Sequence, residues 1–148
     1  MSAPDLDDLR QLAGRVLPGG SLRIAPYEVA IADDALESPH REGGRPHPIW
    51  LVIASLRGLG ITVDELCELA RKSPQDTLLI GDVEISHRAP LSSGTEYLTT
   101  ARIGAVDRRE TRDGGVLDTL VVIVDVLDDT RATMGQVTST YLVKRAVA

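Results

Sequence analysis

The stretch Ile49-Trp50-Leu51-Val52-Ile53-Ala54 decides how this chain should fold. Pro48 precedes it, in the position that proline favours in the first turn of a helix, and Gly60 follows a few residues later. A helix that is apolar on nearly all sides must be buried. The sequence therefore predicts a buried helix over residues 48–59. Its β-branched residues leave a buried strand as the alternative.

A second helix and four strands are predicted after this helix. The second helix begins at Thr62, which can form a capping box with Glu65, and it should end before Pro74. The strands are rich in β-branched residues and are separated by glycines and aspartates. The third has no polar break, so we expect it to be central and covered on both faces. The predicted strands are 77–86, 96–106, 116–127 and 134–144.

The region before the apolar stretch is less regular. Leu6, Leu9 and Leu12 follow helical spacing, which predicts a short amphipathic helix that stops at Pro18. Residues 22–32 alternate in part but include Pro26, a pattern that favours an edge or interrupted strand.

The order of these elements predicts an α+β fold of one domain, residues 1–148. An early strand, a buried helix and a run of long antiparallel strands are expected when a curled sheet wraps around a central apolar helix. This is the hot-dog fold. A length of 148 residues with 43% hydrophobic residues suits a single core. Long edge strands in such a sheet are normally covered, so we expect a homodimer or a heterodimer.

Composition excludes several classes of function. The net charge of -6, without a cluster of basic residues, argues against a nucleic-acid partner. The start is acidic and no apolar run approaches membrane-spanning length, so we expect an unprocessed protein that does not bind membranes. Cys67 is the only cysteine, which favours the cytoplasm. Three histidines and one cysteine never fall into metal-ligand spacing, and there is no phosphate-binding glycine loop, so neither metal nor cofactor is expected.

Two segments resemble the family of MaoC-like hydratases and dehydratases. Residues 81–98, GDVEISHRAPLSSGTEYL, are similar to a family pattern in which a strand leads into an "rPl..Gd.l" turn and the next strand. His47-Pro48-Ile49-Trp50 is similar to the "hP.f" start of the hot-dog helix. With further similarity in the later strands, the resemblance covers about the last two thirds of the chain, and it implies the hot-dog fold.

The resemblance also implies a site for an acyl thioester, carried by coenzyme A or by a carrier protein. Catalytic members hold an Asp and a His five positions apart in a "GD.NP.H" motif, and these activate the water added to an enoyl thioester. Here Asp34 precedes His40 by six positions and the glycine is missing. The resemblance implies catalytic roles for Asp34 and His40. The chemistry itself admits Asp33, Asp34 or Glu37 as the acid together with His40 or His47, and we expect substrate contacts at Pro48, Ile49 and Trp50. Such hydration needs a base, a proton donor and donors for the thioester oxygen.

Four functions remain open from the sequence. The first is an R-specific enoyl thioester hydratase or the reverse 3-hydroxyacyl dehydratase. The altered motif favours a second, a non-catalytic hot-dog subunit paired with a catalytic partner. A thioesterase that uses a carboxylate to direct water at the carbonyl is the third. The fourth is a binding module without chemistry.

Overall fold

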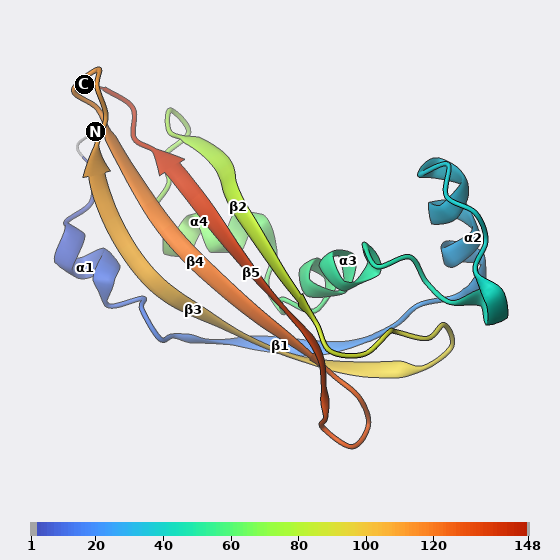
Figure 1. Cartoon of the computed structure of the whole chain (residues 1–148). Coiled ribbons are helices and arrows are strands. Elements are labelled where there is room, and N and C mark those ends of the chain that lie inside the picture. The colour runs from blue at the N-terminus through green and yellow to red at the C-terminus, as the bar shows by residue number, and fades with distance from the viewer. Residues whose placement is uncertain (1–2, 148) are drawn as a thin grey trace.

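The computed structural model describes residues 3–147 and is built on a five-stranded antiparallel sheet (Figure 1). The order of the strands is β1-β3-β4-β5-β2, so β4 is central, as predicted. Each of the four strands predicted after the apolar helix is present. The strands are β1 (Val16–Arg23), β2 (Thr77–His87), β3 (Glu96–Glu110), β4 (Val116–Leu127) and β5 (Thr133–Lys144).

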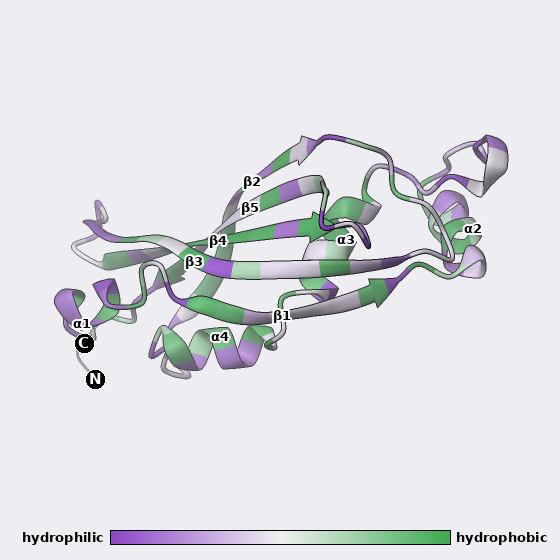
Figure 2. Ribbon diagram, turned by 90° about the horizontal axis from the view of Figure 1, so that it is seen from below, coloured by the Kyte–Doolittle hydropathy of each residue, from purple (hydrophilic) through white to green (hydrophobic). Residues whose placement is uncertain are grey.

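Two helices cover one face of the curled sheet, which confirms the α+β hot-dog class (Figure 2). The apolar stretch forms helix α3 (Trp50–Arg57), and the strand alternative for it is wrong. The second helix is α4 (Val63–Leu69), where the side chain of Thr62 accepts the N–H of Glu65 at 3.0 Å. The remaining helical segments are α1 (Leu6–Arg10), α2 (Pro26–Ala35) and the 3₁₀ turn η1 (Glu42–Gly44).

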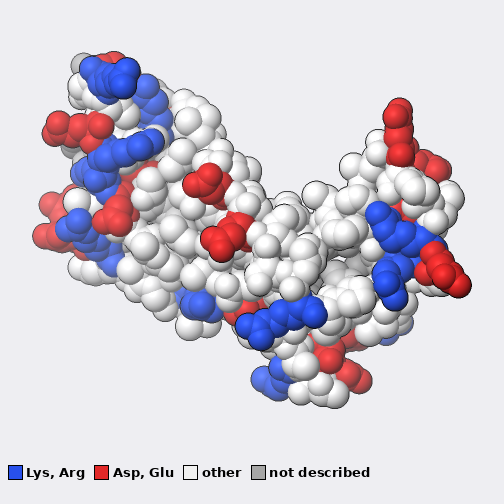
Figure 3. Space-filling view, viewed as in Figure 1, with Lys and Arg blue, Asp and Glu red and all other residues white. Residues whose placement is uncertain are grey.

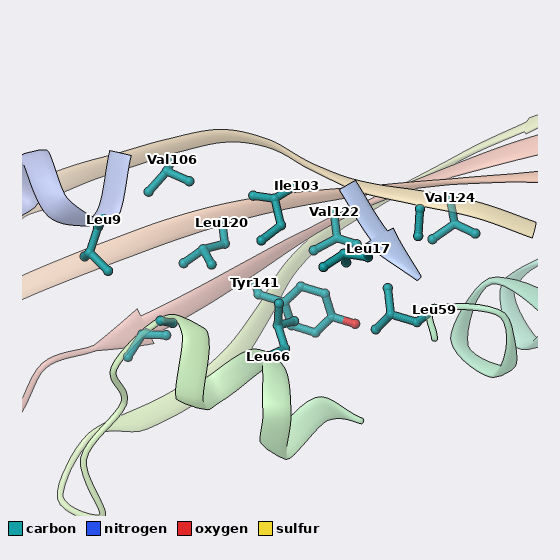
Figure 4. Packing of buried hydrophobic residues seen from close by; sticks show 13 residues of the cluster. Leu9, Leu17, Leu59, Leu66, Ile103, Val106, Leu120, Val122, Val124 and Tyr141 are labelled. Atoms are coloured by element: carbon teal, nitrogen blue, oxygen red, sulfur yellow. The ribbon is translucent and has the colours of Figure 1, made fainter. Parts of the chain in front are cut away.

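The core has two parts along the concave face of the sheet. Beneath α4, Leu66 packs with Tyr141 and with aliphatic side chains of β3 and β4 (Figure 4). Beneath α3, Trp50 and Leu51 pack with Tyr97 and other residues of the sheet. Each fully buried aliphatic or aromatic side chain contributes about 1.5–3 kcal/mol to folding.

Helix α3 is less enclosed than the sequence predicts. Val52 and Ile53 are only half-buried, and Leu56 on the far side is 51% exposed. The residues of β4 alternate between buried and half-buried, so this strand is fully covered on one face only. The reason is that α3 and α4 form a single layer on one face of the sheet, and no second layer of the described chain covers the outer face of the sheet or the outer side of α3.

Residues 26–35 form helix α2 and not the edge strand that the sequence suggested. Pro26 occupies the first turn, where its fixed φ and missing N–H are compatible with a helix. The carboxylate of Glu28 accepts the N–H of Ala25 at 3.1 Å, which satisfies a free donor at the helix start. The proline that was interpreted as a strand interruption is therefore a helix start. Helix α2 stands apart from the sheet (Figure 1).

The first strand also begins earlier than predicted. Helix α1 ends at Arg10, and β1 includes the Pro18-Gly19-Gly20 segment that was expected only to stop a helix. A bulge falls between Leu17 and Gly20 in the pairing with β3. Gly19 has φ 63°, and a Cβ there would overlap the carbonyl oxygen of Thr99. Glycine is required at this point because the two backbones approach each other so closely.

Strand β2 forms an edge of the sheet and leaves apolar side chains in solvent. Ile80 pairs with Tyr141 and Ile85 pairs with Val137. Directly opposite residues share a face, so Ile80 and Ile85 point to the side on which Tyr141 and Val137 are buried. Nevertheless Ile80 is 63% exposed and Ile85 40% exposed. The concave face is therefore open along β2. No helix among residues 3–147 is long and apolar enough to cross a membrane.

Candidate functional site

The end of α2 carries a buried carboxylate. Asp33 is 1% exposed, and its backbone carbonyl accepts the N–H of Ser38 at 2.9 Å, which folds the loop back over the helix end. The guanidinium of Arg41 donates to one carboxylate oxygen of Asp33 at 3.3 Å. A buried charge needs such a partner, so this loop is held by an ion pair.

His40 lies between two carboxylates. Its Nδ1 is 3.5 Å from the carboxylate of Asp33, and its Nε2 is 3.6 Å from that of Asp34. The structure therefore brings together Asp34 and His40, as the sequence suggested, and places Asp33, another of the candidate acids, at the other ring nitrogen. These distances exceed those of strong hydrogen bonds. The side chains of His40 and Asp34 are 67% and 78% exposed, so this group is open to solvent.

His47 has a different role at the start of the apolar helix. Its Nδ1 accepts the N–H of Ile49 at 3.0 Å. A ring nitrogen that accepts a hydrogen bond carries no proton, so Nε2 is left as the donor of this ring. His47 is half-buried, Pro48 is exposed and Ile49 is half-buried.

A cavity of about 430 Å³ lies beside this helix start. The walls come from the loop before α3, from α3 itself and from the connection after β2. His47 and Pro48 are among the lining residues, but Asp34, His40, Ile49 and Trp50 are not. The full set is Arg41, Arg45, Pro46, His47, Pro48, Leu51, His87, Arg88, Ala89, Pro90 and Leu91. In a space-filling view, a notch with mostly uncharged walls separates the arm that carries α2 from the rest of the molecule (Figure 3).

Trp50 belongs to the core and does not line this cavity. It is 3% exposed, and the guanidinium of Arg57 lies 5.2 Å from the centre of its ring. Its indole N–H has no hydrogen-bond partner within the described chain. Of the six predicted site residues, the structure thus groups Asp34 with His40, and His47 with Pro48. Ile49 adjoins His47 through its backbone.

Sequence reasoning missed the basic residues of the site, Arg41, Arg45 and Arg88. Arg41 and Arg45 lie in a loop interpreted only as polar and turn-rich, while Arg88 follows a strand far along the chain. A local excess of arginine within an acidic protein was the one available signal. Their convergence on one cavity depends on the fold.

Other reactive groups do not extend the site. Burial raises the pKa of the Cys67 thiol, which keeps it protonated and poorly reactive. Residues 3–147 contain no group of three or more His, Cys, Asp or Glu side chains placed to hold a metal ion.

The fold and this geometry can be compared with known proteins. Neither a protein-family model nor a curated protein sequence matches the chain. Among solved structures, the HadBC 3R-hydroxyacyl-ACP dehydratase complex from Mycobacterium tuberculosis is 13% identical, with a TM-score of 0.66 and coverage of 88% of this chain and 96% of that one. A MaoC-like dehydratase from Rhodospirillum rubrum is 16% identical, with a TM-score of 0.60 and coverage of 92% and 94%. This chain has the hot-dog fold of the MaoC-like dehydratases.

The same fold also serves hydrolysis. A mutant of the fluoroacetyl-CoA-specific thioesterase FlK is 16% identical to this chain, with a TM-score of 0.61 and coverage of 88% and 86%. A shared fold hosts several reactions, so the choice between them must rest on the residues of the site.

Proposed function

We propose that this chain acts on an acyl thioester as a hydro-lyase, an R-specific enoyl thioester hydratase or 3-hydroxyacyl thioester dehydratase. The observation that carries the proposal is the position of His40 between the carboxylates of Asp33 and Asp34. An imidazole oriented by a buried carboxylate and open to solvent on its other side can exchange protons with a water or hydroxyl group of the substrate. No metal is needed for such a proton transfer.

The roles of the three residues follow from their surroundings. Asp33 is buried and bound by Arg41, so it orients the imidazole. Asp34 is exposed and reaches the other nitrogen of His40, so it can address the water molecule. His47 holds the start of α3, where free backbone N–H groups would stabilise negative charge on the thioester oxygen.

The proposal includes a second hot-dog subunit. A chain paired along β2 would cover Ile80 and Ile85, which face the concave side but are exposed here. The acyl chain would lie in the apolar groove that this pairing closes. Two copies of this chain paired about the middle of β2 would bring two Asp82 and two Glu84 side chains into neighbouring positions. Like charges on adjoining strands are destabilising, so a different hot-dog subunit is the favoured partner.

One observation favours a second candidate, a non-catalytic subunit. The predicted pair Asp34 and His40 is solvent-exposed, and neither residue lines the cavity beside α3. In this alternative the chain shapes the acyl groove and the partner subunit supplies the catalytic pair.

Hydration assays on site variants test the proposal. We would purify the protein with any partner that accompanies it from its native host and follow the loss of the conjugated thioester absorbance with enoyl thioesters of several chain lengths. His40→Ala and Asp33→Asn should each lower kcat/KM by about 10²-fold, the usual scale for losing a general acid or base or its positioning. Asp129→Asn, at an exposed turn, is the matched control and should retain full turnover.

The outcomes separate the candidates. Unchanged turnover in both site variants would overturn the catalytic role and support the structural subunit. Release of free thiol without loss of the double bond would instead indicate a thioesterase.

A further inference from the structure

The cavity beside α3 gathers positive charge within an acidic protein. Three arginines and two histidines line it, and none of the described residues that form its wall carries a carboxylate. The five basic residues are Arg41, Arg45, His47, His87 and Arg88. The chain as a whole has a net charge of -6. A hollow lined by one sign of charge focuses the electric field, so this cavity favours an anion.

Two of these arginines have no acidic partner. Within residues 3–147, neither Arg45 nor Arg88 lies within 4.0 Å of a carboxylate oxygen, whereas most other arginines of this range form ion pairs. Glu42 lines a separate hollow with Arg45 and forms no ion pair with it. Arg41, in contrast, is bound to Asp33 at 3.3 Å. The guanidinium groups of Arg45 and Arg88 are thus available to an anion from outside the chain.

The position of the cavity decides which part of a substrate it meets. His47 lines it and also holds the start of α3, where the proposed function places the thioester oxygen. His87 lines it too, ends β2 and points to the same face of that strand as Ile85. The cavity thus adjoins both the expected thioester carbonyl and one end of the apolar groove along β2. Atoms of the acyl group near the reacting carbons are within its reach.

The rest of the wall is apolar and sets what kind of anion fits. It consists of Pro46, Pro48, Leu51, Ala89, Pro90 and Leu91. A volume of about 430 Å³ is in the range of small-molecule sites, roughly 300–1,000 Å³. A purely hydrocarbon chain here would remove water from the guanidinium groups without replacing its hydrogen bonds, which is unfavourable. A carboxylate on a short carbon segment replaces them, because the planar fork of arginine matches its two oxygens.

We propose that the acyl group of the substrate carries a carboxylate of its own, close to the carbons that are hydrated, and that Arg45 and Arg88 bind this carboxylate. The inference rests on the proposed acyl-thioester function and names its substrate class, the thioesters of unsaturated dicarboxylic acids. In a four-carbon member, a short segment separates the thioester carbonyl from the carboxylate. One cavity therefore accommodates the carbonyl at the N–H groups of α3 and the carboxylate at the arginines. Any further hydrocarbon extends into the groove along β2.

Hydration kinetics with two matched substrates test the proposal on the intact protein with its native partner. Both are thioesters of coenzyme A: the trans-butenedioyl thioester carries a carboxylate where the trans-2-butenoyl thioester carries a methyl group. The carrier is the same in both, so a contact between an arginine and the carrier cancels in the ratio of their kcat/KM values. Arg45→Gln and Arg88→Gln should each lower kcat/KM for the dicarboxylate by about 10-fold, the scale of one charge-assisted hydrogen bond, and leave the butenoyl value unchanged.

Matched variants keep the test specific. Arg112→Gln, at the exposed turn between β3 and β4, removes the same charge at a residue that does not line the cavity and should leave both values unchanged. Arg45→Lys should retain part of the preference, since the charge remains and the fork is lost. A ratio that Arg45→Gln and Arg88→Gln do not alter overturns the proposal. An equal loss for both substrates also overturns it, because the arginines would then contact the carrier, and so does the same change of ratio in Arg112→Gln.

Titration calorimetry separates this proposal from the hydro-lyase function. The probes are the succinyl and butyryl thioesters of coenzyme A, which are saturated and cannot be hydrated. The succinyl thioester should bind at least about 10-fold more tightly, and Arg45→Gln and Arg88→Gln should each reduce this preference. An arginine-dependent preference without hydration of any enoyl thioester supports the carboxylate site and removes the hydro-lyase function. Equal or absent binding of the two probes, with normal hydration of the butenoyl thioester, overturns the carboxylate site and retains the hydro-lyase.

Discussion

Two buried aspartates of this protein have arginine partners, and they illustrate opposite uses of the same chemistry. Asp118 on β4 is 0% exposed and binds Arg108 at 2.6 Å and Arg145 at 2.7 Å. Asp33 on α2 is 1% exposed, but its contacts to Arg41 and His40 are 3.3 and 3.5 Å long.

The surroundings of the two clusters differ more than their residue types. Arg145 is 3% exposed and also donates to Asp76 at 3.1 Å and to the carbonyl of Ala70 at 2.7 Å, so each of its three guanidinium nitrogens donates a hydrogen bond. Of the partners of Asp33, His40 is exposed to solvent and Arg41 is half-buried. The Asp118 cluster uses its donors and acceptors within the protein and joins α4, β4 and the C-terminal segment. The Asp33 cluster retains donors and acceptors for a ligand. The difference indicates which cluster is structural and which is available for chemistry.

Removing Asp118 should have the largest effect. Asp118→Ala leaves Arg145 buried with fewer acidic partners, and breaking a buried ion pair in this way costs about 3–5 kcal/mol. Urea unfolding of the variant and the natural protein would measure this loss. A loss below about 1 kcal/mol would show that the cluster is not a structural centre.

Removing Asp33 should cost less stability. After Asp33→Ala, the Arg41 and His40 side chains can be hydrated, so we expect a loss of about 1–2 kcal/mol, the scale of hydrogen bonds to a charged group. The same urea titration applies. If Asp33→Ala destabilised the protein as much as Asp118→Ala, the contrast between the two clusters would be lost.

The cluster around Asp118 and Arg145 should also make the free energy of unfolding depend on pH. Burial alone would raise the pKa of Asp76, but the N–H groups of Ala146 and Ser73 and the Arg145 guanidinium hold this pKa below its ordinary value. A carboxyl with a depressed pKa in the folded state contributes stability above its unfolded pKa of about 3.9, and that stability is lost as pH falls through the folded pKa. Asp76→Asn should flatten this part of the unfolding curve below about pH 4. An unchanged slope would exclude Asp76 as the cause.

The smallest effect is expected for a pair on the outer face of the sheet. Arg102 and Asp125 are 3.3 Å apart, with side chains 45% and 19% exposed. Such pairs contribute about 0.2–1 kcal/mol and are screened by salt. Arg102→Gln should therefore shift the urea midpoint only slightly, and added salt should reduce the shift. A loss as large as that of Asp118→Ala would mean that exposure does not explain the contrast.

Much of the secondary structure follows from the sequence alone. The apolar run at 49–54, the Thr62 cap and the β-branched strands were sufficient to place α3, α4 and β2 to β5, because these signals act over a few residues. The same kind of local signal predicted a strand where α2 lies and placed the first strand later than β1. Pro26 is compatible with both a strand interruption and a helix start, and the 18–20 segment becomes a strand only where Gly19 meets the backbone of Thr99.

The site depended on the tertiary structure to a greater degree. The sequence suggested Asp34, His40 and His47 as neighbours, but which acid is buried and which histidine faces a cavity follow from how α2 and its loop fold back. Arg45 and Arg88 are far apart in the sequence and line the same cavity only because β2 leads back toward the start of α3. Local propensity is a property of short segments, whereas burial and charge pairing are properties of surfaces brought together by the whole fold.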